Sequence, residues 1–119
     1  MKILVFDTET TGLPTERNAS LLSTNKWPYI VQLSYILYDT SNLIVLDYSD
    51  QIIKIPDNVT IPKVCEDIHK ISTEISKTKG VDIKNELVNF NRVMLDADII
   101  VAHNLIFDKN IITVECMRH

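Results

Sequence analysis

Two carboxylates stand two positions apart at the point where an apolar stretch of the sequence ends. Residues Ile3 to Phe6 are apolar, Asp7 follows directly, and Glu9 comes two residues later. Side chains at positions i and i+2 of a strand project to the same face, so Asp7 and Glu9 are expected side by side. Two close carboxylates repel each other, and a hard divalent cation relieves that repulsion. The pair is consistent with a Mg²⁺ or Mn²⁺ site and also with two solvated acids at a strand end.

A third acid follows a second apolar stretch near the end of the chain. Residues 98–104, DIIVAHN, predict a short buried strand, and Asp108 falls on the first turn of the helix expected after it. If this strand lies beside the first one, Asp108 reaches the same end of the sheet, where ligands bind in open α/β sheets. Three acids at two adjacent strand ends favour a metal site over a chance arrangement.

The first half of the chain predicts the strands that would position these acids. Residues 2–7 are nearly all apolar, which is typical of a central strand covered on both faces. Residues 29–39 alternate in polarity and predict a long strand. A turn-forming TSN at 40–42 separates them from a further strand at 43–55, so the two strands are expected to form a hairpin.

Helices are predicted for most of the second half. A short helix begins with Pro62 in its first turn. A second helix is capped by Ser72 or Thr73 and ended by Gly80. Asp82 caps a third helix, whose apolar residues form one stripe: Ile83, Leu87, Phe90 and Met94. With a last helix after the final strand, the order of elements indicates an α/β fold with a mixed sheet.

Composition and charge restrict the class of protein. The 119 residues predict one domain, 1–119, of ordinary globular composition with 45% hydrophobic residues. A net charge of −4 argues against a broad basic surface for duplex nucleic acid, although bound cations would let an acidic site take a phosphate substrate. Cys65 and Cys116 lack metal-ligand spacing, and no secretory or membrane-spanning stretch is evident. These features predict a cytoplasmic or nuclear protein that is not secreted and has no membrane partner.

Two motifs of the sequence resemble those of a known family. FDTETTG, residues 6–12, resembles the first motif of the DEDD 3′–5′ exonucleases, the DnaQ-like group with a ribonuclease H-like fold. VAHNLIFDKNII, residues 101–112, is similar to their second motif. Between them, residues 27–39 resemble the second strand of the family, and residues 61–72 resemble its H-G-I-T segment, with Lys70 where Gly is usual. The resemblance covers essentially the whole chain.

The resemblance implies a function and roles for the acids. The family hydrolyses phosphodiester bonds at the 3′ end of single-stranded DNA or RNA, as in DNA proofreading, and releases nucleoside 5′-monophosphates. It implies a site for two Mg²⁺ or Mn²⁺ ions, bridged by Asp7. Glu9 would hold the ion that carries the attacking water, and Asp108 would hold the other ion, largely through water. A DNA polymerase or another replication protein is an implied partner.

The resemblance also implies a nucleotide-binding site. The backbone near Thr10 would contact the terminal 3′ hydroxyl group. Gly12 or Leu13 would lie against the last base, and Gly12 would let the substrate approach the backbone closely. Asn104 and Phe107 would border the nucleotide pocket, where an aromatic ring suits contact with a base.

A third motif implied by the resemblance is absent from these 119 residues. It carries a fourth Asp and a His or Tyr general base, so the sheet is expected to lack its last strand and the C-terminal helix. Asp108, Glu115 and His119 share one helical face, but Glu115 and His119 are predicted to have ordinary helix-surface roles. His69 and His103 are predicted to be structural.

Two interpretations follow, and both predict weak or no nuclease activity for this polypeptide alone. The chain is either the N-terminal part of a longer exonuclease domain or a short relative. The short relative would be a non-catalytic nucleic-acid-binding or protein-interaction module that kept the fold. Without the fourth acid one ion lacks a ligand, and without the base no placed group takes the proton of the attacking water.

Overall fold

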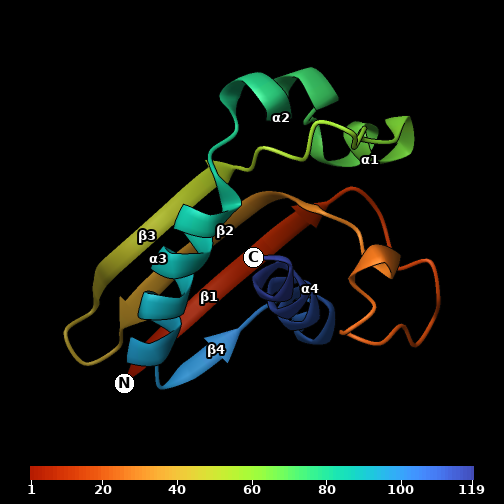
Figure 1. Cartoon of the computed structure of the whole chain (residues 1–119). Helices are drawn as coiled ribbons and strands as arrows, with labels where there is room; N and C mark the ends of the chain where they lie inside the picture. The colour runs from red at the N-terminus through yellow and green to blue at the C-terminus, as the bar shows by residue number, and fades with distance from the viewer.

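A mixed sheet of four strands in the order β3-β2-β1-β4 organises the molecule, and the computed structural model describes residues 1–119 (Figure 1). β1 (Lys2–Thr10) pairs antiparallel with β2 (Ile30–Asp39), which pairs antiparallel with β3 (Ile44–Ile52). On its other side β1 pairs in parallel with β4 (Ile99–Val101). The predicted hairpin, mixed sheet and neighbouring parallel strands are therefore confirmed.

The helices follow the signals of the sequence closely. α1 (Lys63–His69) directly follows Pro62. Ser72 accepts a hydrogen bond from the backbone of Ile75 at the start of α2 (Thr73–Lys79), and Gly80 follows its last residue. The Ser72 cap was predicted because it depends on only a few neighbouring residues.

The two longer helices belong to the second half of the chain. Asp82 accepts a hydrogen bond from the backbone N–H of Lys84 and caps α3 (Ile83–Asp96), as predicted. α4 (Leu105–Arg118) follows β4, and a 3₁₀ turn, η1 (Thr24–Lys26), lies in the connector after β1. None of the helices combines the length and the apolar composition that crossing a membrane requires.

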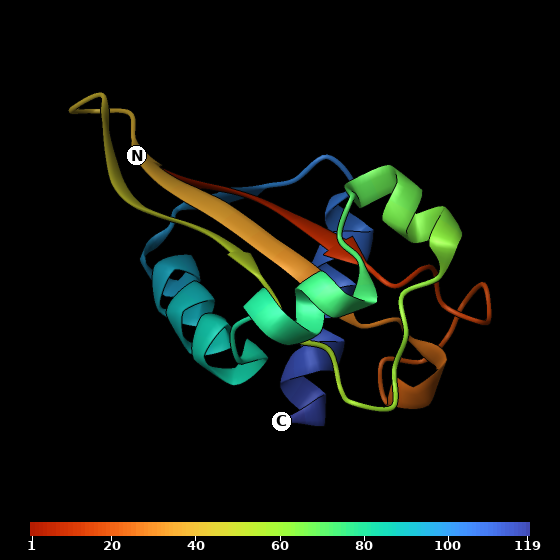
Figure 2. The ribbon, with the colours of Figure 1, turned by 90° about the horizontal axis from the view of Figure 1, so that it is seen from above.

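α3 and α4 pack against the same face of the sheet (Figure 2). The ring of Phe90 on α3 makes edge-on contacts with the rings of Phe6 on β1, at 5.0 Å, and Tyr35 on β2, at 5.7 Å. The predicted stripe of α3 faces this core. The buried residues of this core include Leu4, Phe6, Leu33, Tyr35, Leu87, Phe90, Val93, Ile111 and Val114. We call this side of the sheet the covered face.

The opposite side, which we call the open face, carries no helix. Val101, Val5, Ile36 and Tyr48 lie opposite one another across all four strands and are 43%, 46%, 46% and 74% exposed. The prediction that residues 2–7 are covered on both faces is therefore wrong. An apolar run gives no information on whether a second layer of structure is there to cover it.

The strand predicted at 98–104 is shorter and less buried than expected. β4 contains only Ile99 to Val101, and both of these residues are more than 40% exposed. The reason is its position at the edge of the sheet, where only β1 pairs with it. A run of apolar residues in an edge strand cannot be told from a buried strand by its pattern alone.

Candidate functional site

The parallel pairing of β1 and β4 brings the carboxyl ends of both strands to one edge of the sheet. Asp7 projects from β1 to the open face and is exposed, opposite Ser34 of β2. Glu9 follows on the same face, half-buried, opposite Gln32. The two carboxylates therefore share one face of one strand, as their spacing predicts.

Asp108 reaches the end of β1 from the other side. It lies in the first turn of α4, is only 3% exposed, and its Oδ1 accepts a hydrogen bond of 2.6 Å from the hydroxyl of Thr8. Thr8 alternates with Asp7 and Glu9 along β1 and points to the covered face. Asp108 thus meets the strand between the two other acids.

The three acids act on each other electrostatically. Burial raises the pKa of the Glu9 carboxyl above its ordinary value, and repulsion from Asp7 and Asp108 raises it further. Burial also raises the pKa of Asp108, and the charge of Asp7 adds to this, while the hydrogen bond from Thr8 opposes it. A cation placed among these groups would remove the like-charge repulsion.

The donor types fit a hard divalent ion, but the side chains are not gathered around one point. No group of three or more His, Cys, Asp or Glu side chains in the chain lies close enough together to hold an ion. Asp7 and Glu9 offer carboxylate oxygens from one face, and Asp108 is engaged with Thr8. Mg²⁺ commonly keeps several waters and takes one or two direct carboxylates, so this set suits it with Asp108 acting through water.

A cavity of about 510 Å³ opens beside Glu9. Four of the five residues predicted to bind a nucleotide line it: Thr10, Gly12, Leu13 and Phe107. The fifth, Asn104, does not line it and instead stands exposed at the start of α4. We call this space the β1–α1 cavity, because α1 forms its other wall.

Sequence reasoning missed the contribution of α1 to this cavity. Val64 and Ile68 line it, although they are 67% and 73% exposed to solvent. Cys65 and His69 lie one residue further along the same helix and line it too. The available signal was a pair of apolar residues, Val64 and Ile68, four positions apart on a predicted short helix.

The turn after β1 has a fixed local geometry. The hydroxyl of Thr10 donates to the carbonyl of Gly12 at 2.7 Å and accepts from the backbone N–H of Gly12 at 3.2 Å. Gly12 has a φ angle of +149°, which side chains disfavour, while the space around its Cα is open. Gly12 is therefore needed for the shape of the turn, and the free space beside it belongs to the β1–α1 cavity.

Glu115 does not have the surface role predicted for it. It is only 2% exposed, its Oε2 atom accepts a hydrogen bond from the backbone of Ile30 at 3.0 Å, and its Oε1 atom pairs with Arg118 at 2.9 Å. Arg118 also donates to three backbone carbonyls of the connector and lies over the ring of Tyr29. Glu115 thus anchors the connector and β2 to α4, whereas His119 is exposed as predicted.

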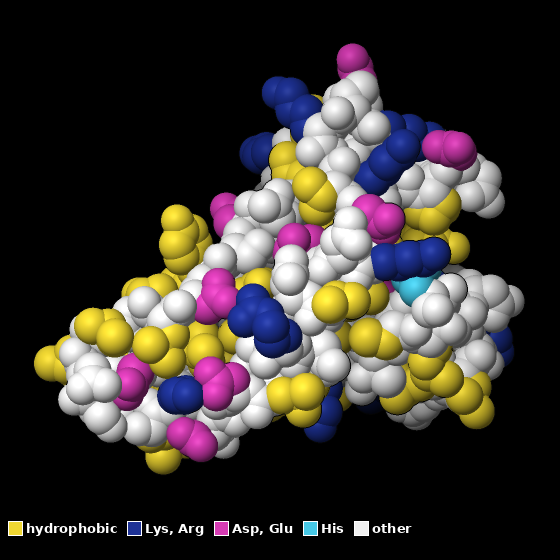
Figure 3. Space-filling view, turned by 60° about the vertical axis from the view of Figure 1, so that its left-hand side comes forward, with side chains coloured by type: hydrophobic (Ala, Val, Ile, Leu, Met, Phe, Trp, Pro, Cys, Tyr) yellow, Lys and Arg dark blue, Asp and Glu magenta, His cyan; other side chains and the backbone are white.

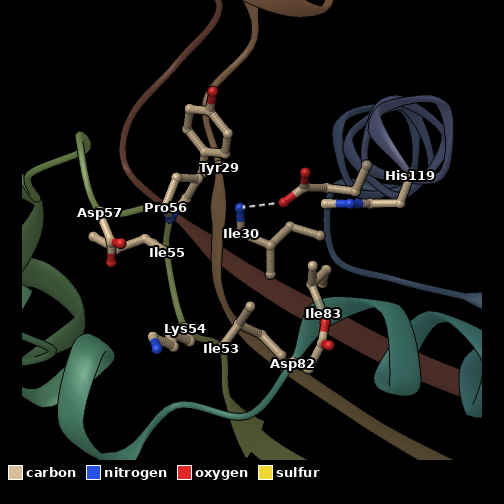
Figure 4. A pocket seen from close by; sticks show the side chains of 11 residues that line it. Tyr29, Ile30, Ile53, Lys54, Ile55, Pro56, Asp57, Asp82, Ile83 and His119 are labelled. Atoms are coloured by element: carbon tan, nitrogen blue, oxygen red, sulfur yellow. Dashed lines mark hydrogen bonds between the residues drawn. The ribbon is translucent and has the colours of Figure 1, made fainter.

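A second cavity, of about 440 Å³, lies at this end of α4 (Figure 4). Figure 4 shows its lining of Ile30, Ile53 and Ile83 with Lys54 and His119 around it, and the dashed line is the bond from Ile30 to Glu115. None of the three predicted acids lines this cavity. It is therefore separate from the candidate metal site.

Comparisons with known proteins give a family and, separately, a fold. An exonuclease family model of the RNase T type matches residues 4–119. E. coli Exonuclease I in complex with a dT13 oligonucleotide has the same fold, with a TM-score of 0.72 and 17% identity over 93% of this chain and 22% of that chain. The apo form of Exonuclease I gives 0.73 at 16% identity, covering 93% and 23% of the two chains. An ExoI/SSB-Ct complex gives 0.71 at 17% identity, covering 93% and 22%.

The lengths of these proteins differ. The chain spans less than a quarter of each Exonuclease I chain that it matches. No curated protein matches the sequence.

Proposed function

We propose a function from the premise that this chain belongs to the RNase T exonuclease family, which is of the DEDD type and has a ribonuclease H-like fold. The function is metal-dependent hydrolysis of phosphodiester bonds at the 3′ end of single-stranded DNA or RNA. The products are nucleoside 5′-monophosphates. The activity of residues 1–119 alone would be weak or absent, because these residues offer three acids at the site and no placed general base.

The position of Glu9 is the observation that carries this proposal. Glu9 belongs to the acids that repel one another at the end of β1, and it also lines the β1–α1 cavity with Leu13 and Phe107. A nucleotide needs these two environments next to each other, a cation site for its phosphate and an apolar space for its base. The cavity volume of about 510 Å³ lies in the range of small-molecule sites.

The residues at the site take separate parts in this chemistry. Asp7 and Glu9 would hold Mg²⁺ or Mn²⁺ from the open face, and Asp108 would hold an ion through water. The bound ions would supply stabilisation of the charge on the phosphate and an attacking water of lowered pKa. Leu13 and Phe107 would contact the terminal base and keep water away from it. The backbone at Thr10 would meet the 3′ hydroxyl group.

The charge distribution supports single-stranded ends as the substrate. Lys and Arg side chains are scattered among Asp and Glu on the face seen in Figure 3 and form no broad basic stripe. Long duplex nucleic acid is held mainly by such stripes, whereas one terminal nucleotide needs only the cation site and the cavity.

We extend the proposal to a polymerase or another replication protein as partner, in the cytoplasm or nucleus.

The test is hydrolysis of 5′-labelled single-stranded DNA and RNA oligonucleotides with Mn²⁺ or Mg²⁺, at high protein concentration. Wild type should shorten the strand stepwise from its 3′ end and Asp7→Asn should not. Asp50→Asn is the matched control, because it makes the same change two strands away on the open face. Equal laddering by wild type and Asp7→Asn would rule out hydrolysis that depends on Asp7.

One observation favours a second function, binding without hydrolysis. Asp108 is buried and bonded to Thr8, so the three acids do not converge on one point. A non-catalytic module that kept the fold would bind a single-stranded oligonucleotide or a nucleotide in the β1–α1 cavity. It would release no mononucleotide at any Mn²⁺ concentration, and this outcome separates the two functions.

A further inference from the structure

The last turn of α1 is fastened to the end of β1 by His69. Its Nδ1 atom accepts a hydrogen bond from the backbone N–H of Ile71 at 3.1 Å, and its Nε2 atom lies 3.2 Å from the carbonyl oxygen of Thr10. A ring nitrogen that accepts an N–H carries no proton, so the proton of the neutral imidazole is on Nε2. His69 therefore donates to Thr10 while it accepts from Ile71.

A second side chain of α1 holds the next carbonyl. Cys65, one helical turn before His69, donates its S–H to the carbonyl oxygen of Thr11 at 3.4 Å. Residues four positions apart lie on one face of a helix, so this face of α1 contacts two consecutive carbonyls after β1. Lys70, in the left-handed conformation with φ of 63°, then ends the helix directly after His69.

These contacts fall on the segment that joins the acids to the β1–α1 cavity. The pairing of β1 with β2 shifts register between Glu9 and Thr10, so the regular ladder is interrupted there. Beyond the shift, Thr10 and Leu13 line one side of the cavity, while Val64 and Ile68 of α1 line the other. The hydrogen bond from His69 joins these two sides directly.

We propose that His69 is a positioning residue for nucleotide binding, because it fixes the turn after β1 against α1 and so sets the width of the β1–α1 cavity. The proposal rests on the proposed function for the identity of the ligand. His69 does not need to touch the nucleotide for this role. Loss of the Nε2 donor lets the turn and α1 separate. The cavity is then no longer preorganised, and nucleotide binding must pay the cost of ordering the turn.

Two substitutions separate this role from a purely structural one. In His69→Asn the side-chain oxygen can take the place of Nδ1 and still accept from Ile71, but the side chain is too short to reach Thr10. In His69→Gln the side-chain amide can take the place of Nε2 and still donate to Thr10. A residue needed only to end α1 would be replaced best by Asn, and a residue needed to hold the turn would be replaced best by Gln. His119→Asn, an exposed histidine outside the site, is the matched control.

The first measurement needs no ligand. Amide hydrogen exchange is followed at Thr11 and Gly12, whose N–H groups are bonded to the carbonyl of Tyr29 and the hydroxyl of Thr10. We expect faster exchange of these amides in His69→Asn and exchange close to wild type in His69→Gln and His119→Asn. Unchanged exchange in His69→Asn would overturn the proposal, whether or not any nucleotide binds.

The second measurement is the affinity for dTMP with Mn²⁺, by calorimetry, in the same proteins. His69→Asn should bind about threefold to tenfold more weakly than wild type, the factor expected for one hydrogen bond, and His69→Gln should stay near wild type. Equal affinity of His69→Asn and wild type would overturn the positioning role. Absence of dTMP binding by wild type would overturn the proposed function, and the exchange result would still decide whether His69 holds the turn.

Discussion

The two faces of β1 differ in what surrounds them and in what they do. On the covered face, Leu4 and Phe6 are less than 5% exposed beneath α3 and α4. On the open face, Val5 is 46% exposed and Asp7 meets solvent. The covered face contributes the buried apolar area that stabilises the fold, whereas the open face carries acids that repel one another and need a cation.

The two faces meet at the end of the strand, where Thr8 is bonded to Asp108. This bond connects α4 to β1 at the level of the acids. Functional groups of this kind commonly lower the stability of the protein that carries them. The comparison thus predicts that substitutions on the covered face lower the free energy of unfolding. Substitutions that remove the charge of one of the acids should lower it less or even raise it.

The largest effect on stability is expected for Phe90→Ala. Phe90 is 2% exposed and its ring contacts Phe6 and Tyr35. Its removal leaves a cavity in the covered core, and the free energy of unfolding should fall by about 3–5 kcal/mol. Urea denaturation measures this. Ile36→Thr, on the open face, should change the free energy of unfolding by less than about 1 kcal/mol. A loss as large as that of Phe90→Ala would mean that the open face is buried in solution.

Thr8→Val is expected to have the next largest effect, and one that depends on pH. Valine keeps the shape of threonine and removes the donor to the buried Asp108 carboxylate, at a cost of about 1–3 kcal/mol at neutral pH. The pKa of Asp108 is already raised in the folded protein, so the fold binds this proton more tightly than the unfolded chain does. The contribution of Asp108 to stability is therefore fully present below the ordinary pKa of Asp and is lost as the pH rises through the raised pKa.

Thr8→Val should make the total fall in stability larger, because the carboxylate loses the hydrogen bond that favours its charged form. Asp108→Asn does not titrate and can still accept the hydrogen bond from Thr8, so it should reduce the dependence of stability on pH. Thermal melts at a series of pH values between 3 and 8 compare the three proteins. Parallel pH profiles for wild type and Asp108→Asn would show that Asp108 does not titrate in this range.

The smallest effect is expected for Glu9→Gln in the absence of divalent ions. Burial and the charge of Asp7 raise the pKa of Glu9, so its carboxylate form is less favourable in the folded protein than in the unfolded chain. The neutral amide should raise the free energy of unfolding by no more than exposed charges usually contribute, about 1 kcal/mol. The melting temperature should therefore rise slightly. The measurement is a thermal melt in EDTA at pH 7. A lower melting temperature for Glu9→Gln would mean that Glu9 stabilises the fold instead of serving a ligand.

Those parts of the fold that depend on local chemistry could be predicted from the sequence. Ser72 and Asp82 mark the starts of helices because each acts within about one helical turn. Gly80 ends α2 as predicted, but in an extended conformation where the backbone of Ile53 and Lys54 leaves no room for a side chain. The apolar period of α3 and the alternation of β2 are equally local. The shared strand end of Asp7, Glu9 and Asp108 needed one further assumption, the parallel pairing of β4 with β1, and this pairing is present.

The remaining features depend on partners far away in the sequence. Glu115 is buried because the backbone N–H of Ile30, distant in the sequence, donates to it. Its pairing with Arg118 three residues on is local, but such a pair is equally common on a helix surface and does not indicate burial. The bond from Thr8 to Asp108 joins residues 100 positions apart. The contribution of Val64 to the β1–α1 cavity likewise depends on where α1 packs. Such contacts appear only when the elements are assembled.

The most direct test of the central claim, that Asp7 and Glu9 hold a divalent ion to which Asp108 contributes through water, is the melting temperature during titration with Mn²⁺. An ion that binds the folded chain stabilises it by about 2.7 kcal/mol at a concentration of 100 times Kd. The melting temperature should rise in wild type and in the control Asp50→Asn, and should stay constant in Asp7→Asn. No rise in wild type, or an equal rise in Asp7→Asn, would contradict the claim.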